Sequence, residues 1–301
     1  MIVENKEGLD YLNKLRDGTL ELGLGIGCAL DKNLMFKRQQ LVFNNGLDNV
    51  GKTYFMVWYM LCLTVKHNLT WTVYSTENSI AKIKRDLIHF LANENIVDLD
   101  EALYRHYFTY VSEHFKFIST ENIYTFDEIL DLFKQSSTDG YLIDPLTALI
   151  NGTIKINKHE TDNENMLKLR AWLNKNNKTV YINTHVSNEA ARRRHPDGNE
   201  YEGLPHPRNK QDNEGGQKMA NRADDFLTTH RYTQHEHHWM YTHIHVRKVK
   251  DTITGGMPTM NEEPIVLKHN ADFSFTIGGI NPLKTEEKQE DIFTEKSEAP
   301  F

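Results

Sequence analysis

The segment Gly46–Thr53, with the sequence GLDNVGKT, constrains the fold of this chain more than any other feature. It fills every fixed position of the phosphate-loop pattern G-x-x-x-x-G-K-[ST]. The run at 40–43 predicts a strand, and the apolar run at 54–61 predicts a buried helix. A strand, a glycine-containing loop and a helix in this order predict a triphosphate site. The alternative is an ordinary strand-to-helix turn.

The residues of this loop have separate expected roles. Gly46 and Gly51 let the backbone turn so that its amides point inward, and the helix beginning near Lys52 adds the positive end of its dipole. We expect Lys52 to reach the terminal phosphates of ATP and the Thr53 hydroxyl to bind Mg²⁺. The other expected nucleotide contacts are Asp48, Asn49, Val50 and Tyr54.

Composition sets limits on the rest of the chain. Its 301 residues, 39% hydrophobic and 26% charged, suffice for one large α/β domain with short appendages, or for two small domains. Cys28 and Cys62 form no C-x-x-C pair, which favours a reducing compartment. The start has no secretory pattern, and no run of about 18 apolar residues occurs. We therefore expect a soluble, cytoplasmic protein with no membrane partner.

The formal net charge of -7 is partly concentrated at one end of the chain. The acidic residues there are Glu286, Glu287, Glu290, Asp291, Glu295 and Glu298. Such a composition predicts a disordered tail over 284–301. The terminal Pro300-Phe301 is similar to the partner-docking tips of single-stranded DNA-binding proteins.

Two acidic residues follow predicted strands. Glu77 ends the strand predicted over 71–77, and Asp144 ends the one predicted over 140–144. Because parallel strands end at the edge that carries the phosphate loop, both carboxylates are expected to converge there. We expect Asp144 to serve Mg²⁺ and Glu77 to orient water. The alternatives are an Asp-Pro turn for Asp144 and a helix cap for Glu77.

A histidine lies at the end of a further predicted strand. His185 follows the strand predicted over 179–183 and is expected at the same edge. Its imidazole could hydrogen-bond to the terminal phosphate and report its loss. A polar residue satisfied by its neighbours is the alternative.

The region 190–218 is rich in basic, Pro, Gly and Asn residues and predicts a long mobile loop. Guanidinium and ammonium groups suit a phosphodiester backbone, so single-stranded DNA is the expected partner. The expected contacts are Arg192, Arg193, Arg194, Arg208, Lys210 and Lys218. Acidic residues in the same region offset much of this charge, so a merely solvated loop is the alternative.

Histidines are dense between residues 230 and 245. His235, His237 and His238 are expected in a hairpin turn, whereas His243 and His245 alternate on one strand. The cluster has no cysteine and lacks the usual ligand spacing, so we disfavour zinc.

The order of these motifs resembles the RecA-like motor domain of DnaB-type replicative helicases, particularly those of bacteriophages. The resemblance extends over residues 20–280. It is carried by 46–53, 75–79, 142–144, 183–185, 215–217 with 223–224, and 248–251 with 254–255. It implies an α/β fold with a central, mostly parallel sheet flanked by helices.

The resemblance also implies roles for single residues. The glutamate matching Glu77 activates water, the acid matching Asp144 serves Mg²⁺, and the residue matching His185 senses the γ-phosphate. In the family a late strand supplies basic groups to the neighbouring subunit, and Lys248 and Lys250 match it. The family commonly has arginine where this chain has Lys250, so the trans-acting residue is in doubt. Arg231 and Arg247 are candidates to compensate, and a strand with a basic solvent face is the alternative.

The domain organisation implied is a linker helix in 1–20, an ATPase core in 21–283 and the tail 284–301. No amino-terminal primase or collar domain is expected, and Leu9, Leu12 and Leu15 are expected to dock on a neighbouring subunit. The implied function is an ATP-dependent DNA helicase on single-stranded DNA, as a hexameric ring in the cytoplasm of a bacterial host. The tail is a candidate contact for other replication proteins. The alternatives are a RecA-like recombination or annealing ATPase and a nucleotide-switched assembly or loading protein.

Overall fold

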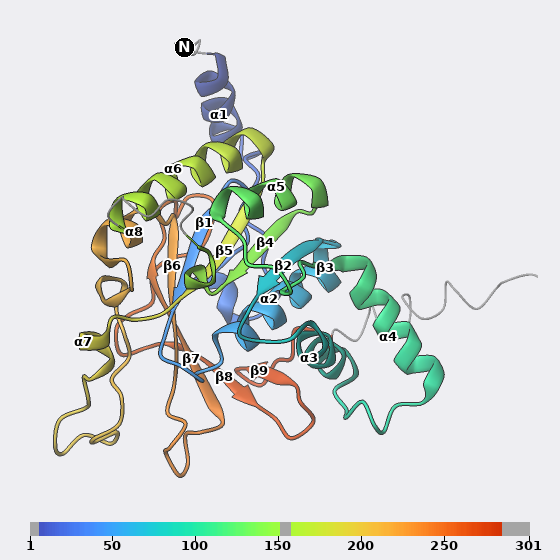
Figure 1. Cartoon of the computed structure of the whole chain (residues 1–301), viewed down its shortest axis with the longest axis vertical. Coiled ribbons are helices and arrows are strands. Elements are labelled where there is room, and N and C mark those ends of the chain that lie inside the picture. Colours follow the sequence, from blue (N-terminus) through green and yellow to red (C-terminus); the bar gives the residue numbers. More distant parts are fainter. Residues whose placement is uncertain (1–5, 151–157, 285–301) are drawn as a thin grey trace, which may run out of the picture.

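The fold is built on one nine-stranded sheet. The computed structural model describes residues 6–150 and 158–284. The strands lie in the order β3-β2-β4-β5-β1-β6-β7-β8-β9 (Figure 1). Their bounds are β1 Leu41–Asn45, β2 Trp71–Ser75, β3 Phe115–Phe117, β4 Gly140–Asp144, β5 Thr179–Thr184, β6 Asp225–Arg231, β7 Tyr241–Lys248, β8 Ile265–His269 and β9 Phe275–Ile277. Strands β3 to β6 in this order pair in parallel and β7, β8 and β9 are antiparallel, which confirms the predicted α/β class.

Helices cover both faces of the sheet. Their bounds are α1 Lys6–Arg16, α2 Lys52–His67, α3 Ile80–Ala92, α4 Glu101–His114, α5 Phe126–Ser136, α6 Lys158–Asn176, α7 Asn188–Ala191 and α8 Gly216–Arg222, with 3-10 turns η1 Ala29–Lys32, η2 Leu146–Ala148 and η3 Lys210–Asp212. One apolar cluster joins α2, α3 and α4 to one face, and a second joins α5, α6 and α8 to the other. In the described part of the chain, no helix combines the length and apolarity needed to cross a bilayer.

The two clusters follow from the alternation of side chains along each strand. In β1, Val42 belongs to the cluster with α2, whereas Leu41 and Phe43 belong to the cluster with α6. Helix α2 is buried along most of its length because the antiparallel strands also pack on it. Trp58, for example, meets Phe275 edge-on with ring centroids 5.4 Å apart. The helix that starts at the phosphate loop is therefore firmly fixed.

Helix starts are set by side-chain caps. The Ser79 hydroxyl accepts a hydrogen bond from the Lys82 amide at the start of α3. Thr125 and Glu128 form a reciprocal capping box at the start of α5. At α2 the cap position is Gly51, whose φ of 91° leaves the first amides of the helix without a side-chain partner. Those amides remain directed toward the loop.

The predicted segments agree with the structure except in two places. The strand predicted over 71–77 ends at Ser75, which leaves Glu77 in the turn before α3. The single loop predicted over 190–218 is wrong in extent, because α7, η3 and part of α8 lie in it. The linker helix expected in 1–20 corresponds to α1, which projects from the rest of the molecule in Figure 1. The acidic tail, from residue 285 onward, lies outside the described residues.

Candidate active site

The phosphate loop connects β1 to α2 at the carboxyl edge of the sheet. A Cβ atom at Gly46 would lie 2.4 Å from the Thr229 carbonyl oxygen, so only glycine fits between the loop and β6. Gly51 and Asn49 have positive φ angles of 91° and 59°, which bend the loop back toward α2. The close approach and the two left-handed residues explain why this spacing needs glycine at both ends.

Lys52 lies inside the curve of this loop. Its ammonium group donates hydrogen bonds to the carbonyl oxygens of Gly46, at 3.2 Å, and Leu47, at 2.9 Å. The residue is only 5% exposed, and burial lowers the pKa of the ammonium group, an effect that the nearby Glu77 and Asp144 oppose. A buried ammonium group with only carbonyl partners is well suited to receive a polyphosphate.

Asp144 and Thr53 meet at the end of β4. The Thr53 hydroxyl donates to the Asp144 carboxylate at 2.8 Å, as Ser75 does at 2.7 Å. Asn183 donates to the other carboxylate oxygen at 2.7 Å. Asp144 is fully buried, and burial raises its pKa although these three neutral donors lower it. A buried carboxylate beside a threonine hydroxyl, with neutral partners only, fits the oxygen donor set that Mg²⁺ prefers.

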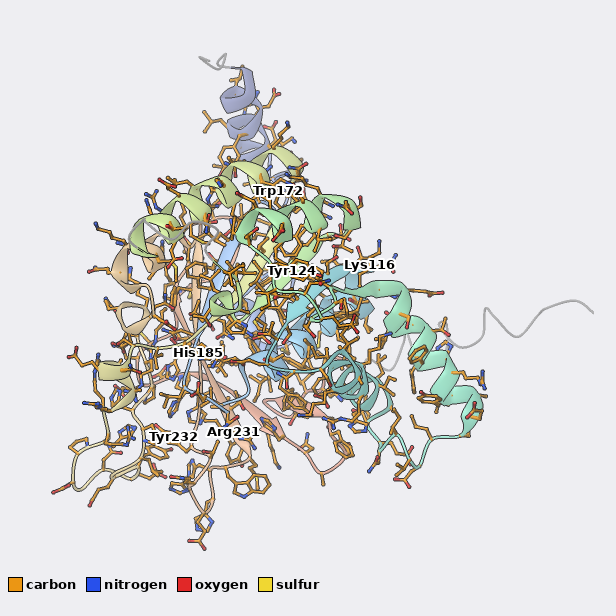
Figure 2. All side chains as sticks on the ribbon, in the orientation of Figure 1. Lys116, Tyr124, Trp172, His185, Arg231 and Tyr232 are labelled. Atoms are coloured by element: carbon orange, nitrogen blue, oxygen red, sulfur yellow. The ribbon has the colours of Figure 1, made fainter. Side chains whose placement is uncertain are left out.

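Glu77 lies across the loop from Asp144 and is paired with His185. The two side chains are 3.1 Å apart, and the other ring nitrogen of His185 is 3.1 Å from a carboxylate oxygen of Asp48 (Figure 2). The hydrogen bond between them lowers the pKa of Glu77 and raises the pKa of His185. The histidine therefore links an acid beside the cradle to the crest of the phosphate loop.

A cavity of about 200 Å³ opens beside these groups. It is lined by residues that include Asn49, Gly51, Lys52, Thr53, Tyr54 and Glu77. The ring of Tyr54 itself packs among aromatic residues, with its centroid 4.7 Å from that of Phe90 and 5.2 Å from that of Phe275. The structure thus brings together the loop residues, Asp144, Glu77 and His185, as the sequence predicted.

Asparagines between the central strands were not assigned a role from the sequence. Asn44 donates to the side-chain oxygen of Asn183 at 3.0 Å and accepts from the Thr229 hydroxyl at 2.8 Å. Asn183 in turn positions Asp144. Asn78 donates to the Thr53 hydroxyl at 3.3 Å. The signal that could have revealed this network was the occurrence of asparagines at the ends of otherwise apolar strands.

Lys248 and Lys250 lie at the opposite edge of the sheet. Lys248 pairs in register with Phe226, near the start of β6, whereas Arg231 ends β6 beside the phosphate loop. The length of β6 separates the two edges by about 20 Å. Arg231 therefore cannot stand in for Lys250 at one shared contact, and that expectation is wrong. Its guanidinium instead donates to the Trp239 carbonyl.

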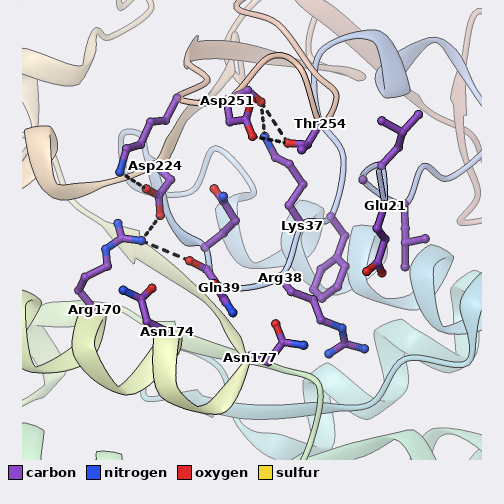
Figure 3. A pocket seen from close by; sticks show the side chains of 16 residues that line it. Glu21, Lys37, Arg38, Gln39, Arg170, Asn174, Asn177, Asp224, Asp251 and Thr254 are labelled. Atoms are coloured by element: carbon purple, nitrogen blue, oxygen red, sulfur yellow. Dashed lines mark hydrogen bonds and ion pairs between the residues drawn. The ribbon is translucent and has the colours of Figure 1, made fainter. Parts of the chain in front are cut away.

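Both lysines have partners at that edge. Lys248 donates to the carbonyl oxygens of Asn221 and Ala223. Lys250 is 3.2 Å from the Asp224 carboxylate, whose other oxygen binds Arg170 of α6 (Figure 3). These residues line a polar cavity of about 650 Å³, far from the phosphate loop. Arg170 was not singled out from the sequence, because its role depends on α6 lying beside β6.

The basic residues of 190–218 are divided between surface and interior. Arg192, Arg193, Arg194 and Lys218 are exposed, although Arg193 is paired with Asp212. Lys210 is half-buried and donates to Asn221 at 3.5 Å.

Arg208 differs from the other basic residues of this region. It is 1% exposed and donates to the Arg193 carbonyl oxygen at 3.1 Å. The expectation that Arg208 contacts a phosphodiester at the surface is therefore wrong for this conformation. Its charge is used inside the segment, where it links 191–193 to 208.

Comparisons with known proteins bear on the fold. No family model and no curated protein sequence matches this chain. The solved ATPase domain of a phage helicase superimposes with a TM-score of 0.73 and 13% identity, covering 92% of this chain and 99% of that one. A DnaB-like replicative helicase, solved with its interactions with primase, gives a TM-score of 0.70 and 13% identity, covering 92% of this chain and 67% of that one. The resemblance found in the motifs is thus confirmed at the level of fold: the chain has the RecA-like fold of the ATPase domains of DnaB-like replicative helicases.

Proposed function

We propose that this chain hydrolyses ATP and uses the energy to move along single-stranded DNA as a replicative helicase motor. The observation that carries the proposal is the convergence of Lys52, Thr53, Asp144 and Glu77 on one edge of the sheet. The fold shared with helicase ATPase domains supports it. A loop that needs glycine at 46 and 51 and encloses a buried ammonium group is suited to a polyphosphate.

Each group has a role in the proposed hydrolysis. Thr53 and Asp144 hold Mg²⁺, which neutralises charge on the bridging phosphates when it is bound. Lys52 leaves its carbonyl partners and binds the terminal phosphates. Glu77 accepts a hydrogen bond from the attacking water and takes its proton. His185 already touches Glu77 and Asp48, so it is placed to sense whether the γ-phosphate is present.

The exposed basic residues supply the proposed contact with DNA. Arg192, Arg194 and Lys218 can reach phosphates without reading bases. Unwinding then follows from exclusion of the second strand. In a proposed hexameric ring, Lys248 and Lys250 face the neighbouring subunit and stabilise charge at its site, which makes hydrolysis depend on assembly.

The test is a measurement of ATP turnover with and without single-stranded DNA, together with the particle mass. DNA-stimulated turnover by a ring, with processive strand displacement, supports the helicase. Stimulated turnover by filaments without displacement indicates the recombination or annealing ATPase. Tight nucleotide binding with negligible turnover in both conditions indicates the nucleotide-switched loading protein and contradicts the proposal.

A further inference from the structure

A second cavity lies between the basic segment 192–209 and the strand pair β6–β7. Its volume is about 280 Å³, and none of the residues that line it belongs to the phosphate loop. The lining includes His195 and His206 from the segment, Tyr232 after β6, and His245 of β7. Figure 2 places Tyr232 beside the extended segment that follows α7. The cavity thus lies next to the exposed arginines 192–194, on the same chain segment.

Aromatic rings form the walls of this cavity. Tyr232 stacks on Tyr201 with centroids 3.9 Å apart and ring planes 1° from parallel. His195 donates to or accepts from the Tyr232 hydroxyl at 3.0 Å, and its ring centroid lies 4.7 Å from that of His206. Flat rings from two different chain segments suit a planar ligand, because every nucleobase offers a π-face for stacking.

One buried side chain on the wall has unused hydrogen-bonding capacity. His245 is 2% exposed, and neither of its ring nitrogens has a hydrogen-bond partner. Burial lowers its pKa to about 3, so the imidazole is neutral. A neutral imidazole offers one donor and one acceptor. Buried polar groups are normally satisfied, so such a side chain at a cavity indicates a ligand with a complementary edge.

Other ligand classes fit this cavity less well. The described residues contain no group of three or more His, Cys, Asp or Glu side chains placed to hold a metal ion. An anion is disfavoured because His245 is neutral, Glu262 lies on the wall, and Arg247 already donates to Asn261 at 3.1 Å. The volume lies just below the range of roughly 300–1,000 Å³ typical of drug-sized ligands, which leaves room for one small ring system.

We propose that this cavity binds one unstacked nucleobase of a single strand whose backbone is held by the exposed arginines 192–194. The base stacks against Tyr232 and the histidine rings of 195–206, and its edge pairs with His245. This inference rests on the proposed function, because it requires a single strand at the basic segment. It adds a contact with the base to a surface otherwise suited only to phosphates.

The test compares two labelled oligonucleotides of about 12 residues, one of deoxythymidine and one with abasic sugars throughout. Binding is measured by fluorescence anisotropy on the full chain with a non-hydrolysable ATP analogue. The wild type should bind the thymidine strand about tenfold more tightly, the size expected for one stacked base. His245→Leu should reduce this ratio to about twofold or less, because it removes the polar edge while keeping the volume.

The chain offers a matched control in His89 of α3. Its Nε2 atom is also buried without a partner, but it packs on Phe273, away from the basic segment. Replacing either unpartnered histidine by leucine should leave the thermal midpoint unchanged or raised. His89→Leu should keep the tenfold ratio. His206→Ala, at an exposed wall position, is a second variant that leaves the core intact and should also lower the ratio.

Several outcomes would overturn the inference. Equal binding of both strands by the wild type, or an unchanged ratio in both His245→Leu and His206→Ala, rules out a base in this cavity. If both strands bind equally while free thymidine shifts the His245 ring signals in an NMR spectrum, the cavity serves a free nucleoside instead. If neither strand binds at all, the proposed function fails together with this inference, which distinguishes the two failures.

Discussion

Glu77 is the residue whose role can be tested most directly. Its carboxylate lies 3.1 Å from His185 and faces the cradle that contains Lys52. Glu77→Gln keeps the shape of the side chain but removes the base. We expect nucleotide affinity to be preserved and ATP turnover to fall about a hundredfold or more, as is usual when a positioned base is lost. Steady-state kinetics and equilibrium nucleotide binding measure the two effects.

Full turnover in Glu77→Gln would reject this assignment of the base. Loss of nucleotide binding would instead place Glu77 among the phosphate contacts. Glu101, exposed in α4 and paired with Arg105, provides a control in the form of Glu101→Gln, for which both quantities should equal those of the wild type.

The Glu77–His185 pair also predicts a pH dependence of stability. The raised pKa of His185 gives a contribution that is present below its ordinary pKa of 6.5 and is lost as the pH rises through the raised pKa. The lowered pKa of Glu77 gives a contribution that is present above its ordinary pKa of 4.5 and is lost as the pH falls through the lowered pKa. The pair therefore stabilises the fold most between these two values.

Comparison with His185→Gln measures this contribution. Because the side chains are 25% and 38% exposed, the difference in unfolding free energy should stay below about 1 kcal/mol. Denaturant unfolding of both proteins should show it largest between pH 4.5 and 6.5 and smaller at pH 9. A difference that grew steadily toward high pH would contradict the sign derived from the pair.

Helix α1 is the element with the least evident support within one chain. Its side chains Leu9, Leu12 and Leu15 are 58%, 59% and 39% exposed. Apolar residues at this spacing form one face of a helix and indicate a partner surface, proposed to be the adjacent subunit. Deleting residues 1–17 should therefore leave folded monomers. Mass measurement in solution tests this, and rings that persist after the deletion would count against it.

The segment between α7 and α8 predicts a different kind of effect. Arg192 and Arg194 are exposed and belong to the proposed DNA surface. Replacing either by alanine should weaken single-strand binding for all sequences and reduce the slope of log affinity against log salt by about 1. Salt titrations of binding measure this slope. Arg105→Ala, on exposed α4, should leave the slope unchanged.

The molecule as a whole places its basic late strand and its phosphate loop at opposite edges of the sheet. Within one chain, Lys250 is too far from the loop to act there, so any catalytic effect must occur between subunits. Lys250→Gln should lower turnover at least about tenfold while leaving nucleotide affinity unchanged, because charge stabilisation in the transition state is lost.

Mixing provides the matching control. Rings assembled from Lys250→Gln chains and Glu77→Gln chains should recover part of the turnover, since some interfaces then combine an intact base with an intact lysine. No recovery at any mixing ratio would contradict a role for Lys250 in the neighbouring site.

The sequence by itself determined the phosphate loop, its flanking strand and helix, and the acids at the ends of β2 and β4. These features follow from local spacing and from the rule that parallel strands end at one edge. Only the tertiary structure decided which groups meet there. Ser75 and Asn183 hold Asp144 because β4 lies between β2 and β5, an order that no local pattern specifies.

The same reason explains the residues whose positions could not be foreseen. Arg208 is buried, and Lys250 shares Asp224 with Arg170, because segments distant in the sequence pack together. Composition gives the charge of a side chain, but its exposure and its partner are set by long-range packing. The chemistry of the phosphate loop was therefore encoded locally, whereas the support of that site and the division of basic residues between interior and surface arose only on folding.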